Sequence, residues 1–313
     1  MRTISALIVG AAVVASLAAC SSQPLTTADC GIGPTSGDAS ELVTATGDFG
    51  VEPTVDFPTP IITDGIEVTT LITGDGQVVG DSDIADIQTY VYEGTNGAFN
   101  TSGVIRAKVG DEGNPFSEMV ACSAVGSRLA VTVPRNLVYT ADNGAVIPDD
   151  TVVLVMDVTA RYLGKANGVD QIPQAGIPAV VTAPNGQPGL TIPKEAAPTE
   201  LTVSVLKQGD GAVVKEDDAV VVNYTGALWD EGTIFDSTWD QGGATTVVAS
   251  SPDPATGTGI VEGFKEALVG QKVGSQVIVV IPPKLGYGEN AAQAGLSDTA
   301  TLVYVFDVLG IQK

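Results

Sequence analysis

One run of residues occurs twice in this chain, once in each half. Residues 125–134 (VGSRLAVTVP) match residues 273–282 (VGSQVIVVIP) in register, and residues 150–158 match residues 300–308. Each run predicts a Gly turn followed by an apolar strand, because Val, Ile and Thr are enriched in strands. The repeat therefore predicts two copies of one folding unit rather than a single core, which suits a chain of 313 residues.

Two shorter segments extend the repeat. By identity, Tyr92–Gly94 aligns with Tyr224–Gly226, and Phe99–Thr101 aligns with Phe235–Ser237. In this alignment the first copy has Asn100 where the second copy has an Asp. We therefore expect two copies that share a fold and differ in chemistry.

The charge and the residue types present exclude several classes of function. The chain has 14 Lys and Arg against 37 Asp and Glu, a formal net charge of −23, and no His. An acidic surface repels phosphate backbones, so nucleic acid is excluded as a partner. Without imidazole there is no Ser-His or Cys-His catalysis and no His-ligated metal. We expect a site that needs neither metal nor cofactor.

The N-terminus has the pattern of a targeting segment. Residues 1–19 hold Arg2 and then an apolar run, Ile4–Leu17, which is shorter than the roughly 20 residues of a membrane-spanning helix. The sequence Leu17-Ala18-Ala19-Cys20 is typical of a bacterial lipobox. It predicts a cleaved signal peptide and a lipid on Cys20, which would hold the protein at the cell membrane on its extracytoplasmic side. The alternative is a plain secretory signal followed by an incidental Cys.

Two cysteines remain after Cys20. In an oxidising compartment Cys30 and Cys122 are candidates for a disulfide bond, and the alternative is two unpaired, buried thiols. Sequence alone does not show that the two residues lie close enough to bond.

Composition divides the mature chain into four parts. Residues 20–43 are rich in Ser, Thr, Gly and Pro and predict a flexible tether, and residues 44–164 form the first copy. Residues 165–198 contain six Pro and predict a linker with one short edge strand, and residues 199–313 form the second copy. The expected fold class is α+β, in which each copy is a twisted antiparallel β-sheet wrapped around a short α-helix.

Five blocks of residues follow one another in the second copy. They are residues 222–226 (VNYTG), 235–240 (FDSTWD), 260–264 (IVEGF), 281–288 (IPPKLGYG) and 301–304 (TLVY). Together, over roughly residues 200–313, they resemble the FKBP-type peptidyl-prolyl cis-trans isomerases. The resemblance implies the α+β fold described above, isomerase activity on proline-containing polypeptide clients, no cofactor, and macrolides as inhibitors.

The resemblance also assigns residues to a proline pocket. The residues expected to line it and act in catalysis are Tyr224, Phe235, Asp236, Ile260, Val261, Phe264, Tyr287 and Tyr304, with Leu296 as a further substrate-binding wall. Phe264 stands where the family most often has Trp and is expected to form the floor. Asp236 and Tyr287 are expected to contact the peptide, and the N–H of Val261 to bind a substrate carbonyl.

These residue types suit the reaction. Rotation about an X-Pro bond costs about 18–20 kcal/mol, because resonance places charge on the carbonyl oxygen of the planar imide. An apolar cleft disfavours that planar state relative to a twisted one, and a few hydrogen bonds can hold the twisted form. No bond is made or broken, so a site without His is sufficient.

Departures from the family pattern set the limits of the resemblance. Gln241 stands where many members have Arg, Thr245 where many have an aromatic residue, and residues 251–259 are an insertion. The first copy has Asn100, no Gly-aromatic motif, and residues 135–139 (RNLVY) where Tyr-Gly is expected. We interpret the first copy as a scaffold without catalysis. The rival hypotheses for the whole chain are a non-catalytic peptide-binding chaperone or assembly scaffold and, less suited to the repeat, a solute-binding lipoprotein.

Overall fold

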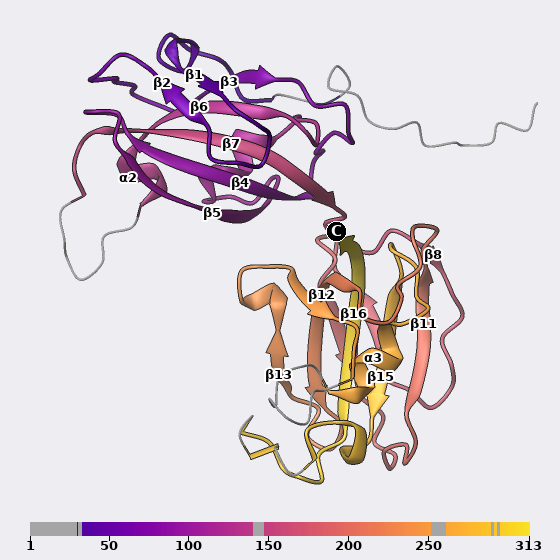
Figure 1. The fold of residues 1–313 in the computed structure, drawn as a ribbon. Coiled ribbons are helices and arrows are strands. Elements are labelled where there is room, and N and C mark those ends of the chain that lie inside the picture. The colour runs from indigo at the N-terminus through magenta and orange to yellow at the C-terminus, as the bar shows by residue number, and fades with distance from the viewer. Residues whose placement is uncertain (1–29, 31–32, 140–146, 252–260, 289–290, 293–294) are drawn as a thin grey trace, which may run out of the picture.

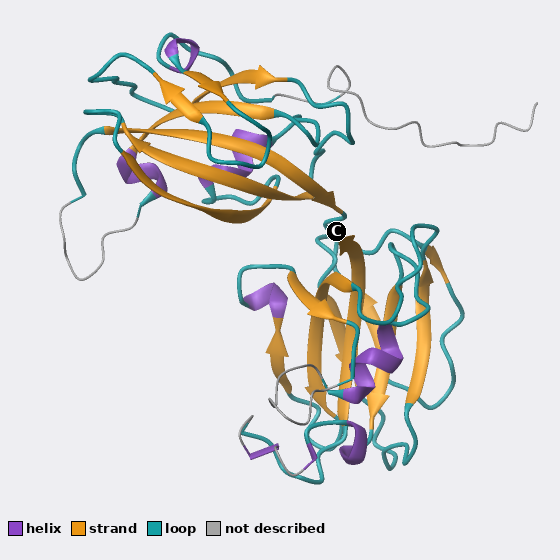
Figure 2. Ribbon diagram, viewed as in Figure 1, coloured by secondary structure: helices purple, strands orange, loops and turns teal. Residues whose placement is uncertain are grey.

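The computed structural model describes residues 30, 33–139, 147–251, 261–288, 291–292 and 295–313. These residues form two domains, each built on an antiparallel sheet (Figure 1). Strands dominate both domains, and the helices are short (Figure 2). Within the described ranges, no helix has the length and apolar character needed to span a membrane.

The first domain has a five-stranded sheet in the order β3-β6-β7-β4-β5. Its strands are β3 (Glu67–Ile72), β4 (Ile84–Glu93), β5 (Phe99–Lys108), β6 (Arg128–Pro134) and β7 (Thr151–Tyr162). The helices α1 (Pro115–Val120) and α2 (Arg135–Val138) lie between these strands in the sequence. Met119 and Val120 of α1 are fully buried in the core on one face of the sheet.

The second domain repeats this order as β11-β15-β16-β12-β13 and adds β8 (Val169–Asp170) at the β11 edge. The strands are β11 (Thr202–Gln208), β12 (Ala219–Leu228), β13 (Ile234–Ser237), β14 (Thr245–Val248), β15 (Gln276–Ile281) and β16 (Leu302–Gln312). The helices are η2 (Thr238–Asp240), α3 (Glu262–Leu268) and η3 (Pro283–Leu285). Phe264, Ala267 and Leu268 of α3 are buried against the sheet, as their spacing predicts.

The equivalence of the domains extends to local contacts. Gly74 and Gly209 each donate their N–H to a serine hydroxyl, that of Ser127 and that of Ser275, both at 2.9 Å. These serines stand at matching places in the repeat. The α+β fold with two sheet-and-helix domains is therefore confirmed.

Each sheet is also covered on its other face, by a hairpin that precedes it in the chain. In the first domain η1 (Ser40–Leu42) is followed by β1 (Thr44–Thr46), which pairs with β2 (Thr54–Asp56) over a second apolar cluster. In the second domain β9 (Ala179–Thr182) pairs with β10 (Pro188–Thr191) in the same role. Segment 165–198, predicted as a linker with one short strand, thus holds β8, β9 and β10 and packs on the sheet.

A disulfide bond joins Cys30 to Cys122, across 92 residues of sequence. Cys122 lies in the turn after α1 with a positive φ of 64°, where the second domain has Gly270 with φ of 86°. The bond ties the segment before η1 to this turn of the first domain. Cys20 lies outside the described residues.

Strand pairing corrects the sequence alignment of β4 with β12. Val152 pairs with Glu93 and Leu302 pairs with Leu228, so Glu93 and Leu228 are equivalent. Tyr92 therefore corresponds to Ala227, three residues from the Tyr224 with which identity had aligned it. The alignment by identity was wrong because register is set by pairing with the neighbouring strand, not by similar local motifs.

Candidate functional site

Four of the predicted aromatic residues meet on the helix-facing side of the second sheet. Tyr224 comes from β12, Phe235 from β13, Tyr304 from β16 and Phe264 from α3. Tyr304 and Phe264 are buried, whereas Tyr224 and Phe235 are half-buried. Side chains alternate between faces along a strand, and Tyr224 pairs with Phe306, two residues after Tyr304, so β12 and β16 present both Tyr residues on the same face.

The rings pack edge to face around Tyr304. Its centroid lies 4.5 Å from Phe264, 5.6 Å from Tyr224 and 5.7 Å from Phe235. Phe306, which the sequence analysis did not name, stacks on Tyr304 at 5.6 Å with an interplanar angle of 13°. We call Tyr224, Phe235, Phe264, Tyr304 and Phe306 the ring cluster.

A glycine makes room for the central ring. Gly226 pairs with Tyr304 across β12 and β16, and a Cβ on Gly226 would lie 2.6 Å from Tyr304 Cε1. That approach is shorter than van der Waals contact, so a larger residue would have to displace the ring. The sequence analysis quoted Gly226 only as part of a motif, and its spatial role follows from the strand register.

Hydrogen bonds connect the rings to Asp236. The Tyr224 hydroxyl donates to Asp236 Oδ2 at 2.9 Å, and Gln241 Nε2 donates to Asp236 Oδ1 at 2.9 Å. Burial raises the pKa of Tyr224 well above its usual range, and its bond to Asp236 adds to the shift. Tyr224 therefore stays protonated and remains a donor at physiological pH. Gln241, which replaces the Arg of many family members, still reaches the carboxylate.

Tyr304 carries a buried hydroxyl. It has no hydrogen-bond partner within the part of the chain that the structure describes. Burial raises its pKa far above the usual range, and the neighbouring Tyr287 hydroxyl and the Asp236 carboxylate act in the same direction. Leaving such a group unpaired costs about 1–3 kcal/mol. The hydroxyl is therefore available to form a hydrogen bond inside the ring cluster.

The remaining predicted residues lie around the ring cluster. Tyr287 follows η3, Leu296 lies in the segment before β16, and both are half-buried against the same apolar core. Val261 is the residue before α3 and is buried. Its N–H meets no acceptor among the described residues. Ile260 lies outside the described residues.

The first domain has lost most of these groups. The positions that correspond to Tyr224, Phe235, Asp236, Tyr304 and Phe306 hold Thr89, Asn100, Thr101, Leu154 and Met156. The counterpart of Asp236 is thus Thr101 rather than Asn100, because Thr101 pairs with Val91 and Asp236 pairs with the equivalent Gly226, and both domains share a β-bulge just beyond this pair. The position of Gly226 is taken by Val91, which leaves no room for a ring.

Two aromatic positions are retained in the first domain, contrary to the expectation that it lacks a floor residue. Counted from the shared turn at Cys122 and Gly270, Phe116 of α1 takes the place of Phe264. Counted from the matching prolines that end β6 and follow β15, Tyr139 takes the place of Tyr287. Both pack against the core of the first domain. What the first domain lacks is therefore the strand-borne half of the ring cluster.

Chemically, the ring cluster offers apolar surface with a few aimed polar groups. Asp236, Tyr224 and Tyr287 are half-buried, and Tyr304 and Phe264 are buried behind them in the same apolar core. No group of three or more potential metal-ligating side chains occurs among the described residues. Such a surface can bind an apolar ring and orient a carbonyl group beside it.

Comparison with known proteins gives an independent result. The family model described as FKBP-type peptidyl-prolyl cis-trans isomerase matches residues 211–309. The probable FK506-binding protein of Corynebacterium glutamicum is 32% identical over 123 residues, which are 39% of this chain and 97% of that protein. The FKBP-type 22 kDa peptidyl-prolyl cis-trans isomerase of Escherichia coli is 38% identical over 111 residues, 36% of this chain and 50% of that protein.

A third relative is the outer membrane protein MIP of Legionella longbeachae. It is 28% identical over 157 residues, which are 50% of this chain and 62% of that protein. The chain thus spans the full length of the Corynebacterium protein but only about half to two thirds of the other two. Residues 211–309, which the family model matches, contain the complete ring cluster.

Proposed function

This chain belongs to the family of FKBP-type peptidyl-prolyl cis-trans isomerases, and we propose that its second domain performs that isomerisation at the ring cluster, on exported proteins at the membrane surface. The enzyme class is that of the family, namely cis-trans isomerisation of the peptide bond before proline. The family binds proline-containing peptides and macrolides.

The proline ring of the substrate packs on Phe264 and Tyr304, between Tyr224 and Phe235. This surface carries no charge, so it desolvates the imide and disfavours the planar, charge-separated state. The twisted imide is then held by hydrogen bonds that the planar one makes less well. Val261 supplies a backbone N–H for a peptide carbonyl, and Asp236 and Tyr287 supply the side-chain contacts.

The observation that carries this proposal is the convergence of residues from three strands and one helix on a single cluster. Tyr224, Phe235, Tyr304 and Phe264 are far apart in sequence, yet every ring lies within 6 Å of Tyr304. Asp236 is fixed beside them by two hydrogen bonds. Ordinary core packing explains the rings but not a carboxylate held at their edge.

The test is a proline-peptide isomerisation assay with matched variants of both domains. We expect Asp236→Ala and Tyr287→Phe to lower kcat/KM, the former by about tenfold, since a lost positioning contact raises the barrier by about 1.4 kcal/mol. Their counterparts in the first domain, Thr101→Ala and Tyr139→Phe, should leave the rate unchanged. An inactive wild type, or equal rates in all four variants, would instead favour the non-catalytic peptide-binding scaffold.

The proposed location is supported by the predicted signal peptide, the predicted lipobox at Cys20 and the name of the Legionella relative, an outer membrane protein. A diacylglyceryl group contributes about 0.8 kcal/mol per buried methylene, which is enough for durable anchoring. Cys20→Ser should move the protein from the membrane fraction to the soluble fraction. Retention of this variant in the membrane fraction would exclude the anchor.

A further inference from the structure

The first domain contacts the segment that carries the candidate catalytic Asp. Trp239 lies in η2, three residues after Asp236, and Lys108 Nζ at the end of β5 in the first domain lies 5.6 Å from the centre of the Trp239 ring. Lys108 forms no ion pair with any described residue. Its ammonium group is therefore free to interact with the ring as a cation over an aromatic face.

A second element fixes Trp239 from another side. A Cβ on Gly186, in the turn between β9 and β10, would lie 2.8 Å from Trp239 Cη2, so the ring rests directly on this turn. Trp239 is thus the point where the first domain, the β9–β10 hairpin and the second domain meet. A cavity of about 290 Å³ is lined at this junction by Lys108, Asn185 and Trp239, among others.

The segment that Trp239 anchors is hydrogen-bonded to two polar residues of the site, Tyr224 and Asp236. Thr238 Oγ1 accepts the N–H of Tyr224 at 3.0 Å and donates to Asn223 Oδ1 at 3.1 Å. Gln241, two residues after Trp239, is the donor to Asp236 Oδ1. Any movement of η2 therefore reaches Tyr224 and Asp236 together.

The chain that follows η2 is tied back to η2 by two backbone hydrogen bonds, from the N–H groups of Gln241 and Gly243 to Thr238 O at 3.2 and 2.9 Å. Gly242 and Gly243 both have positive φ, 95° and 109°, and a Cβ on either would meet nothing within 4 Å. Glycines in open space leave a segment free to change conformation unless neighbouring contacts hold it. In this segment the contacts of Trp239 are the ones that reach outside the second domain.

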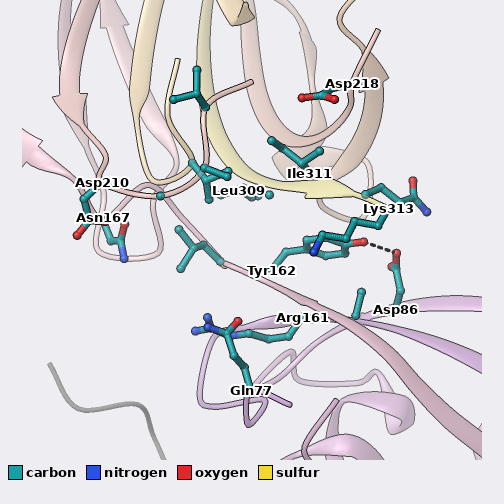
Figure 3. Close-up of a pocket in the computed structure, with 18 of the residues that line it drawn as sticks. Gln77, Asp86, Arg161, Tyr162, Asn167, Asp210, Asp218, Leu309, Ile311 and Lys313 are labelled. Atoms are coloured by element: carbon teal, nitrogen blue, oxygen red, sulfur yellow. Dashed lines mark hydrogen bonds between the residues drawn. The ribbon is translucent and has the colours of Figure 1, made fainter. Parts of the chain in front are cut away.

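Other hydrogen bonds also join the two domains. Arg106 pairs with Asp86 in the first domain and donates to Thr246 Oγ1 of β14 at 3.0 Å. Tyr162 donates to the same Asp86 at 3.1 Å and lies under β16 beside a cavity of about 1120 Å³ between the domains (Figure 3). Leu163 N–H donates to Leu309 O at 3.1 Å. These hydrogen bonds between the domains hold Lys108 in position against Trp239.

From this arrangement we propose that Lys108 and Trp239 are positioning residues, through which the first domain holds η2 and keeps Gln241 bonded to Asp236. The first domain would then take part in isomerisation without touching the substrate. The inference rests on the proposed function of the ring cluster. Under this inference the first domain, which lacks the aromatic residues on its strands, has the role of positioning η2.

The experiment uses the full chain with Lys108→Met, which keeps the aliphatic stem and removes the cation. Lys108→Arg should restore the contact, and Lys272→Met, at an exposed lysine of the second domain, is the control. The chain has two Trp, so ¹⁵N spectra show two indole N–H resonances, and the one missing in Trp239→Phe belongs to Trp239. Thermal unfolding verifies that each variant folds.

For Lys108→Met we expect a shift of the Trp239 resonance alone and a fall of about three- to tenfold in kcat/KM, since small misplacements of positioning groups are costly. Lys108→Arg and Lys272→Met should match the wild type. An unmoved Trp239 resonance, or a moved resonance with unchanged kcat/KM, would overturn the inference.

A failure of the proposed isomerase function can be distinguished from a failure of this inference. If the wild type does not isomerise the peptide, its affinity for the same peptide is measured by calorimetry in each variant. A weaker affinity in Lys108→Met alone still supports a positioning role at a binding site, and equal affinities in all variants overturn it.

Discussion

Both domains bury an aspartate at the same place in the same sheet, but only the first domain neutralises it with a cation. Asp157 pairs with Arg128 at 2.7 Å, and both side chains are fully buried. In the second domain Asp307 faces Gln276, whose Nε2 donates to it at 2.8 Å. Each carboxylate also accepts a backbone N–H, from Gly50 or from Ala166, in the segment that covers the sheet.

This difference shows that one fold can accommodate a buried carboxylate in two ways, in an ion pair or with neutral hydrogen-bond donors. Arg128 also donates to the carbonyl oxygens of Gly47 and Asp48, so the ion pair fastens the covering hairpin to the first domain. Asp307 forms no ion pair with a described residue, and burial raises its pKa to about 6 although Gln276, the Ala166 N–H and the charges of Lys207 and Lys165 act in the opposite direction. The first domain thus uses a fixed charge pair, and the second uses a carboxyl group that can titrate near neutral pH.

The largest expected effect comes from breaking the ion pair. Arg128→Met leaves Asp157 buried and unpaired, and removal of one partner of a buried pair costs about 3–5 kcal/mol. Arg128→Gln copies the second domain and should cost less. Urea unfolding, followed with a probe in the first domain, measures the free energy of unfolding of both variants. Equally small decreases in the two variants would show that the charge pair is dispensable.

A pH-dependent effect is expected from Asp307→Asn. The folded pKa of Asp307 is about 6, against a reference of 3.8, so the folded state binds the proton more tightly. The free energy of unfolding that this group contributes therefore falls as pH rises from about 4 to 6, by about 3 kcal/mol at 1.4 kcal/mol per unit. Asp307→Asn should be more stable than wild type at pH 7.5 and equal below about pH 4. A stability difference that does not change with pH would contradict this.

An intermediate effect is expected from exchanging Gly226, which lies beside the Tyr304 ring, with its larger counterpart in the first domain. Gly226→Val introduces the first domain's Val91 and forces Tyr304 from its place, with an overpacking cost of about 1–3 kcal/mol. We expect kcat/KM to fall by tenfold or more, since the cost falls on the site. Val91→Gly should leave the rate unchanged. Full activity in Gly226→Val would show that the ring position is not required.

The smallest effect is expected from Tyr304→Phe. The ring stays, and the buried, unpaired hydroxyl is removed, which should stabilise the second domain by about 1 kcal/mol. A drop in isomerase activity together with this gain would show that the hydroxyl meets the substrate. Unchanged activity would show that Tyr304 contributes to catalysis only through its ring.

Much of this organisation follows from short-range patterns. The repeat, the helix with Phe264, Ala267 and Leu268 on one face, and the buried strands were predicted because period and composition are local properties. The choice of Tyr224, Phe235 and the other site residues came from a family resemblance. Their convergence could not be read from the sequence, because it depends on which strands are neighbours.

What the sequence by itself determined is the existence of two like units, their α+β character and the residue types available for chemistry. What only the tertiary structure decided is the register. The pairing of β5 with β4 and of β13 with β12 made Thr101 the counterpart of Asp236, and the pairing of β12 with β16 placed Gly226 beside Tyr304. The physical reason is that register is fixed by hydrogen bonds between strands that are distant in sequence, and a shift of one residue turns every side chain to the other face.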